Sequence, residues 1–160
     1  MSRSGLSALF LAFCLIGCAV VPQPAHADTA RKIAIRRALL DIYERTNRTR
    51  DAMEQYQAIM ALAPNDASAH YGLGMLLYRQ QEFAVAAPHL KKACSIEGKP
   101  EYWTALGDCL MQMRNFTGAI DAYRHGGSMA ANKLQSAMQY QQNVKQIENY
   151  NRQLKQREEQ

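Results

Sequence analysis

The side chains that most often carry out chemistry are few in this chain of 160 residues, and their spacing matches no known catalytic or metal-binding motif. The histidines are His26, His70, His89 and His125, and none has another His, Cys or carboxylate at the spacing of a metal-ligand pair. No nucleophile-elbow motif, Walker loop or dinucleotide-binding glycine pattern occurs. We therefore expect no catalytic residues, no bound metal and no cofactor.

The first 27 residues have the features of an export signal. Arg3 precedes a nearly continuous apolar run from Leu6 to Ile16, which is too short to span a bilayer of about 30 Å as a helix. We expect residues 1–27 to lie outside the fold. We also expect the chain to be exported, which makes nucleic acid an unlikely partner for a chain with a net charge of +5.

Two cleavage sites compete within this signal. Residues 15–18 resemble the lipobox of bacterial lipoproteins, in which Cys18 would carry the lipid and hold the protein at the periplasmic face of the outer membrane. The alternative is the A-x-A site at residues 25–27, which would release a soluble periplasmic protein beginning at Asp28. The lipoprotein is our leading interpretation, and both alternatives predict an envelope location.

The remaining chain contains an internal repeat with a period of about 34 residues, and its helix-forming composition favours helices over strands. The landmark residues recur in register. They are Leu39, Leu73 and Leu106; Ala52, Ala86 and Ala119; Phe83 and Phe116; and Leu62, Ile96 and Met129. The best single match to a known pattern is Trp103-x-x-Leu106-Gly107-x-x-Leu110 followed by Ala119-x-x-x-Tyr123.

This pattern resembles the tetratricopeptide repeat family over residues 31–132. The resemblance implies an all-α, right-handed superhelix of three helix-turn-helix repeats, at about residues 33–66, 67–99 and 100–132. Residues 133–160 are expected to form a long C-terminal capping helix with an exposed tail. The first repeat departs from the family pattern, because Arg36 and Leu40 replace its Trp and Gly.

The resemblance also predicts where the helices pack most tightly. In each repeat the Gly of the first helix and the Ala of the second are expected at the closest approach, as with Gly107 and Ala119. Gly126 and Gly127 are interpreted as small residues inside a helix that packs tightly against the next one. Cys94 and Cys109 are expected about 10 Å apart along antiparallel helices, too far for a disulfide, and are predicted to be buried free thiols.

The C-terminal helix has two expected parts. Leu134, Ala137 and Met138 are predicted to cover the open face of the last repeat. Beyond them, apolar residues recur at spacings of three and four with one polar member, in the order Tyr140, Val144, Ile147, Asn151 and Leu154. This part is either a solvent-exposed tail or a short contact surface for a partner helix.

In this family the first helices of successive repeats line a groove that binds ligands, and the matching positions give a candidate binding site here. The predicted groove residues are Arg37, Asp41, Tyr71, Met75, Tyr78, Arg79, Thr104, Asp108 and Met111. Aromatic, Met and Arg side chains are common in binding patches. The alternative is that Tyr71, Met75 and Tyr78 only fill the interior of the superhelix.

The resemblance implies a protein that binds a segment of another protein and does not catalyse a reaction. We expect a scaffold or assembly factor at the cell envelope. The alternatives are a chaperone for a secreted substrate, or a non-catalytic subunit of a cell-wall, secretion or pilus complex. One family ligand is disfavoured, the C-terminal carboxylate of heat-shock chaperones. The positions of that clamp hold Asp41 and Glu101, which would repel it.

Overall fold

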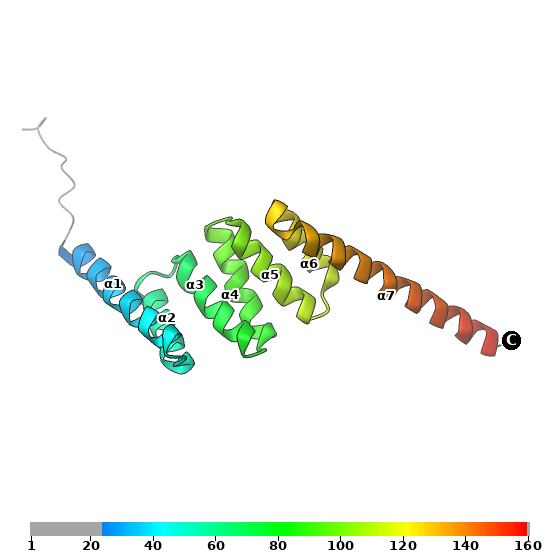
Figure 1. Cartoon of the computed structure of the whole chain (residues 1–160), viewed down its shortest axis with the longest axis horizontal. Coiled ribbons are helices and arrows are strands. Elements are labelled where there is room, and N and C mark those ends of the chain that lie inside the picture. The colour runs from blue at the N-terminus through cyan, green and yellow to red at the C-terminus, as the bar shows by residue number, and fades with distance from the viewer. Residues whose placement is uncertain (1–23, 160) are drawn as a thin grey trace, which may run out of the picture. The chain divides into compact units, whose positions relative to one another are not determined.

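The computed structural model describes residues 24–159, and these residues are almost entirely helical with no strand among them. Their helices are α1 (Pro24–Arg45), α2 (Thr49–Leu62), α3 (Ala67–Arg79), α4 (Phe83–Ile96), α5 (Pro100–Gln112), α6 (Phe116–His125) and α7 (Ala131–Glu158), with a short 3₁₀ turn η1 (Gly127–Ala130) before α7 (Figure 1). The all-α prediction is confirmed. Cys18 and most of the predicted signal lie outside the described residues, and residues 24–27 form the start of α1.

Among the described residues, those from Pro24 to Ile35 belong to one unit and those from Arg36 onward form a second, compact unit, which contains every contact discussed below. Within the second unit each helix from α2 to α7 packs on the next one along the chain. The part of α1 in this unit reaches α2 through a hydrogen bond from Arg36 to Gln55. In the part of the chain described, no helix has the length and apolar character needed to cross a membrane.

The turn inside each helix pair has the same backbone conformation. Asn47, Gln81 and Arg114 all adopt positive φ, at 57°, 64° and 59°, and the second helix of each pair begins two residues later. Left-handed backbone costs an ordinary residue about 1–2 kcal/mol, so its recurrence shows that the packing of the paired helices dictates the turn. The caps between pairs are less uniform, because Asp66 caps α3 through its side chain whereas α5 begins with Pro100 at its first turn.

The repeat landmarks lie where the sequence places them. Ala52, Ala86 and Ala119 are each completely buried, and Leu73 and Leu106 are buried in the main core. A β-carbon on Gly74 would lie 2.8 Å from the side chain of Leu90, and one on Gly107 would lie 2.4 Å from the ring of Tyr123. Each glycine therefore makes room for a large side chain, Leu90 or Tyr123, that lies four residues after the buried alanine of the same pair. The sequence predicted that Gly107 would face Ala119, whereas it faces Tyr123.

Two expectations about the end of the third pair are wrong. Helix α6 ends at His125, Gly127 has a φ of 60°, and the chain turns through η1 before α7, so the two glycines do not lie inside a helix. Gly126 is nonetheless tightly packed, since a β-carbon there would lie 2.8 Å from Ala130 and from Thr104. Met129, aligned with Leu62 and Ile96, is 62% exposed because it falls in this turn.

The first part of α7 covers α6 as predicted. Ala137 is fully buried, and Leu134 packs on the cluster that also contains Ala119 and Tyr123. Met138 does not belong to this contact, because it is 49% exposed, and its predicted capping role is wrong.

Candidate functional site

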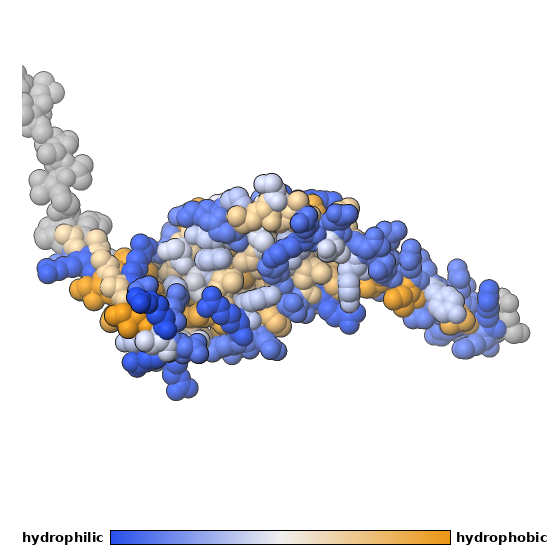
Figure 2. All heavy atoms as spheres, in the orientation of Figure 1, coloured by the Kyte–Doolittle hydropathy of each residue, from blue (hydrophilic) through white to orange (hydrophobic). Residues whose placement is uncertain are grey.

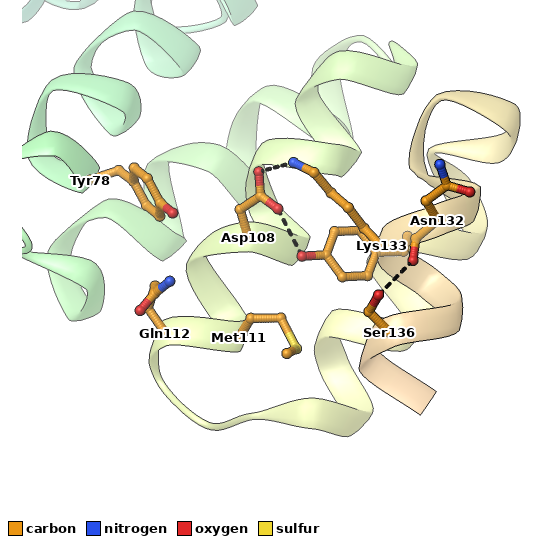
Figure 3. A pocket seen from close by; sticks show the side chains of 8 residues that line it. Tyr78, Asp108, Met111, Gln112, Asn132, Lys133 and Ser136 are labelled. Carbon is orange, nitrogen blue, oxygen red and sulfur yellow. Dashed lines mark hydrogen bonds and ion pairs between the residues drawn. The ribbon is translucent and has the colours of Figure 1, made fainter. Parts of the chain in front are cut away.

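A cavity of about 280 Å³, here called the α7 pocket, opens where α3, α5, α6 and α7 meet. It is lined by Tyr78, Asp108, Met111, Gln112, Tyr123, Asn132, Lys133 and Ser136 (Figure 3). Three of the predicted groove residues, Tyr78, Asp108 and Met111, come together here. The structure thus joins residues of two different helix pairs in one recess.

Asp108 is the polar centre of the α7 pocket. The Tyr123 hydroxyl donates a hydrogen bond to Asp108 Oδ1 at 2.8 Å, and the Lys133 ammonium donates to Oδ2 at 2.5 Å (Figure 3). Burial, together with this hydrogen bond to a carboxylate, strongly raises the pKa of Tyr123, so the phenol stays protonated. The charge of Asp108 is therefore matched within the protein.

The rest of the α7 pocket offers apolar surface and unpaired amides. The ring of Tyr78 and the side chain of Met111 form its apolar walls. An edge contact with Phe83, at 5.3 Å between ring centres, holds the Tyr78 ring in place. Within residues 24–159 the carboxamides of Gln112 and Asn132 have no hydrogen-bond partner. Such groups can bind the backbone of an incoming segment, which has both donors and acceptors.

A second recess, the α1 pocket, is lined by residues of α1, α2 and α3, and it contains the predicted residues Arg37 and Asp41. The Tyr56 hydroxyl donates to Glu44 at 2.6 Å here, the same arrangement of tyrosine and carboxylate as at Tyr123 and Asp108. Burial and this hydrogen bond raise the pKa of Tyr56 well above its usual value. A recurring tyrosine on the second helix of a pair thus fixes a carboxylate on the first.

The charged side chains of Arg37 and Asp41 in the α1 pocket are already paired with other residues, so they are less available to a ligand than the sequence suggests. Arg37 donates to Asp66 at 2.7 Å, and Asp41 lies 3.6 Å from Arg45 in an exposed pair. Although burial opposes it, hydrogen bonds from Ser68, the Ala69 amide and Arg37 lower the pKa of Asp66. Arg37 therefore supports the cap of α3.

The other predicted groove residues divide between surface and interior. Tyr71 stacks on Tyr102 at 4.6 Å between ring centres, and Met75 is partly buried against the main core. Arg79 is exposed and lines a third recess beside Glu44. Thr104 is only 9% exposed and donates to the Pro100 carbonyl, so its predicted place in the groove is wrong.

Both described cysteines and two of the histidines make contacts within the protein. Cys94 and Cys109 are buried and unpaired, as predicted, and burial raises the pKa of the Cys94 thiol to about 11. His70 and His89 lie with their Nδ1 atoms 3.4 Å apart, and His70 Nε2 contacts the Pro64 carbonyl at 3.0 Å. Among the residues described, no three His, Cys, Asp or Glu side chains group as they would around a metal ion.

Sequence reasoning missed the residues that α6 and α7 contribute to the site. Asn132, Lys133 and Ser136 of α7 belong to no family position, and they enter the α7 pocket because the start of α7 packs on α6 and Lys133 reaches Asp108 of α5. Gln112, at the end of α5, was also missed. Tyr123 was recognised as a repeat landmark, but its hydroxyl was not assigned a partner. The family pattern contained no signal for the course of α7.

Comparison with family models identifies tetratricopeptide repeats at residues 37–100 and 100–133. The chain belongs to the tetratricopeptide repeat family. Among curated proteins, no significant match was found.

Solved structures share this fold. The first TPR of Spaghetti (RPAP3) bound to an HSP90 peptide is 16% identical, with a TM-score of 0.64 over 69% of this chain and 93% of that one. PcrH in complex with the chaperone-binding region of PopD is 17% identical, with a TM-score of 0.63 over 72% of this chain and 95% of that one. A Thermobaculum terrenum O-GlcNAc transferase mutant is 20% identical, with a TM-score of 0.62 over 70% of this chain and 23% of that one.

Proposed function

We propose that this protein is a non-catalytic scaffold or assembly factor that binds a segment of another protein in the α7 pocket. The observation that carries the proposal is the pocket's composition, with apolar walls from Tyr78 and Met111 beside the unpaired carboxamides of Gln112 and Asn132. Two solved structures with this fold are complexes with a peptide or a protein region, which supports the proposal.

The size of the α7 pocket suits a single side chain of a peptide. Its volume of about 280 Å³ stands at the lower limit of the roughly 300–1,000 Å³ usual for small-molecule sites. One apolar side chain of a partner would enter between Tyr78 and Met111, and the amides of Gln112 and Asn132 would bind the backbone beside it. The charge of Asp108 is already matched by Lys133, so the pocket selects for an apolar side chain.

We further propose that the protein works at the bacterial cell envelope, and the signal-like residues 1–27 support this location. The partner would then be another envelope protein. The location is independent of the pocket, so each proposal can fail without the other.

The binding proposal is tested by placing a photo-crosslinking amino acid at Gln112 in cells. The matched control is the same amino acid at Glu54, an exposed residue on α2 outside the α7 pocket. We expect a crosslinked partner from position 112 that disappears when Tyr78→Ala and Met111→Ala are added. A melting curve of this double variant checks that it still folds. Equal crosslinking from both positions, or a partner that a folded double variant still captures, contradicts the site.

A further inference from the structure

The second half of α7 carries an exposed apolar stripe that the repeats do not cover. Ala137 is the last buried residue of the chain described, and Tyr140 still packs on Phe116 at 5.0 Å between ring centres. Beyond these contacts Ile147 and Tyr150 are 59% and 60% exposed, and Leu154 is 37% exposed. Figure 2 shows apolar side chains among hydrophilic ones along this helix.

The stripe has the spacing of a two-stranded coiled coil. Val144, Ile147, Asn151 and Leu154, here called the α7 seam, follow one another at intervals of three, four and three residues. Val144 and Asn151 take the a positions, and Ile147 and Leu154 take the d positions of a heptad labelled a to g. Val144 at a with Leu154 at d favours two strands, and a single Asn at an a position specifies the oligomer state, whereas Ile147 at the other d position does not add to this preference.

We propose that the α7 seam binds the α7 seam of a second copy of this chain, in parallel and in register. This proposal does not depend on the proposed function of the α7 pocket, which uses other residues of α7.

Asn151 indicates the orientation of the second copy. A polar residue in an apolar seam costs stability unless it meets a polar partner, and an Asn at an a position then fixes the register. A parallel, in-register pair places Asn151 against Asn151 of the second copy. The antiparallel arrangement with the greatest apolar overlap would place it against Ile147.

The charges that flank the α7 seam agree with the parallel arrangement. Across a parallel pair each g position faces the e position five residues later, so Asn143 faces Glu148 and Tyr150 faces Lys155. No like charges meet. The antiparallel arrangement would bring Glu148 close to Glu148 of the second copy, and like charges at that distance repel. Lys145 and Arg152 occupy b positions, which point away from the α7 seam in both the parallel and the antiparallel arrangement.

The α7 seam is short, and its pairing is therefore weak. Isolated coiled coils usually need three to four heptads, whereas this seam has fewer than two. Contacts with α6 already hold the start of α7 as a helix, so pairing does not have to meet the cost of helix nucleation. We expect a dimer that forms at high protein concentration and separates on dilution.

Sedimentation equilibrium of the full chain tests the pairing. The wild type should show a mass that rises towards two copies with concentration, and Ile147→Asp with Leu154→Asp should raise the dissociation constant at least tenfold. The matched control is Gln146→Asp with Gln153→Asp, which adds the same charges one residue earlier, away from the seam. This control should change the dissociation constant by less than threefold. Both pairs are exposed, so melting temperatures should match. A wild type that stays monomeric into the millimolar range, equal loss in both variants, or a limiting mass above two copies overturns the proposal.

The orientation is tested by Asn151→Cys in the same chain. A parallel, in-register pair brings the two new thiols together, so mild oxidation should give a covalent dimer. The wild type, which has Cys14, Cys18 and the buried Cys94 and Cys109, should not form it under the same conditions. Asn151→Val should tighten the pair several-fold, because it removes the polar residue from the seam. A dimer that forms no disulfide through position 151 overturns the parallel arrangement.

Discussion

At the scale of single residues, the structure separates side chains that bind from side chains that position. Asp108 occupies a family groove position, yet the Tyr123 hydroxyl and the Lys133 ammonium each donate to one of its oxygens, and Lys133 balances its charge. Asp108 therefore organises the α7 pocket. Arg37 likewise supports Asp66 at the start of α3. The repeat predicted which helix carries each candidate groove residue, and three of them meet in the α7 pocket, whereas Thr104 is buried. Their partners could not be predicted, since these lie on other helices.

The His70–His89 contact gives the fold a dependence on pH. Burial, and then the nearby His70, lower the pKa of His89 below its ordinary value of about 6.5. As pH falls below that value, the unfolded chain binds a proton that the folded chain excludes, so the free energy of unfolding decreases. The stabilisation is complete above pH 6.5 and is lost towards lower pH.

We predict that wild-type protein loses more stability between pH 7.5 and pH 5.5 than the variant His89→Gln, which cannot titrate. Urea unfolding at the two pH values measures this difference. Asp66, whose pKa is also lowered, contributes only near and below pH 4, so it does not overlap this window. Parallel pH profiles for the two proteins would show that His89 is not the sensor.

At the scale of helices, the repeat landmarks predicted the packing, while helix ends were predicted less well. The three buried alanines lie at equivalent positions because each sits where two helices meet, and only a small side chain fits there. The end of α6 was mispredicted because apolar residues continue in register through Gly126 and Gly127, whereas the packing of Gly126 on Thr104 and Ala130 turns the chain. Periodicity alone does not report such a contact.

Ala119 offers a direct test of the third helix pair. Its side chain is fully buried in a cluster with Tyr123, Ala130 and Ala137, so Ala119→Leu should overpack α6 against η1 and α7 and cost about 1–3 kcal/mol of unfolding free energy. Chemical denaturation measures the change. The control is Ala84→Leu at an exposed position of α4, which should change stability by less than about 0.5 kcal/mol. Equal effects at the two positions would contradict the packing described for α6.

At the scale of the whole molecule, residues 1–27 and the repeats from Arg36 onward bear on two separate properties, cellular location and partner binding. The repeats determine the fold and the α7 pocket, and residues 1–27 carry the expectation about location. A basic cluster begins soon after them, comprising Arg31, Lys32, Arg36, Arg37, Arg45, Arg48 and Arg50. Each basic residue close to an anionic membrane contributes about 1 kcal/mol, so a lipid anchor at Cys18 and this cluster would act together.

We therefore predict that Cys18→Ala moves the protein from the membrane fraction to the soluble fraction when cells are separated by centrifugation. A diacylglycerol on Cys18 carries two acyl chains, and two chains hold a protein at a membrane more firmly than charge alone. High salt should accordingly release little wild-type protein, because salt screens only the electrostatic part. The matched control is Ala27→Gln, which disables the competing A-x-A site. It should leave the membrane fraction unchanged and alter the mature mass only by the mass of the substitution itself, because a chain that begins at Cys18 keeps residue 27. A soluble wild-type protein that begins at Asp28, and whose processing fails in Ala27→Gln, would contradict the lipid anchor and establish cleavage after residue 27.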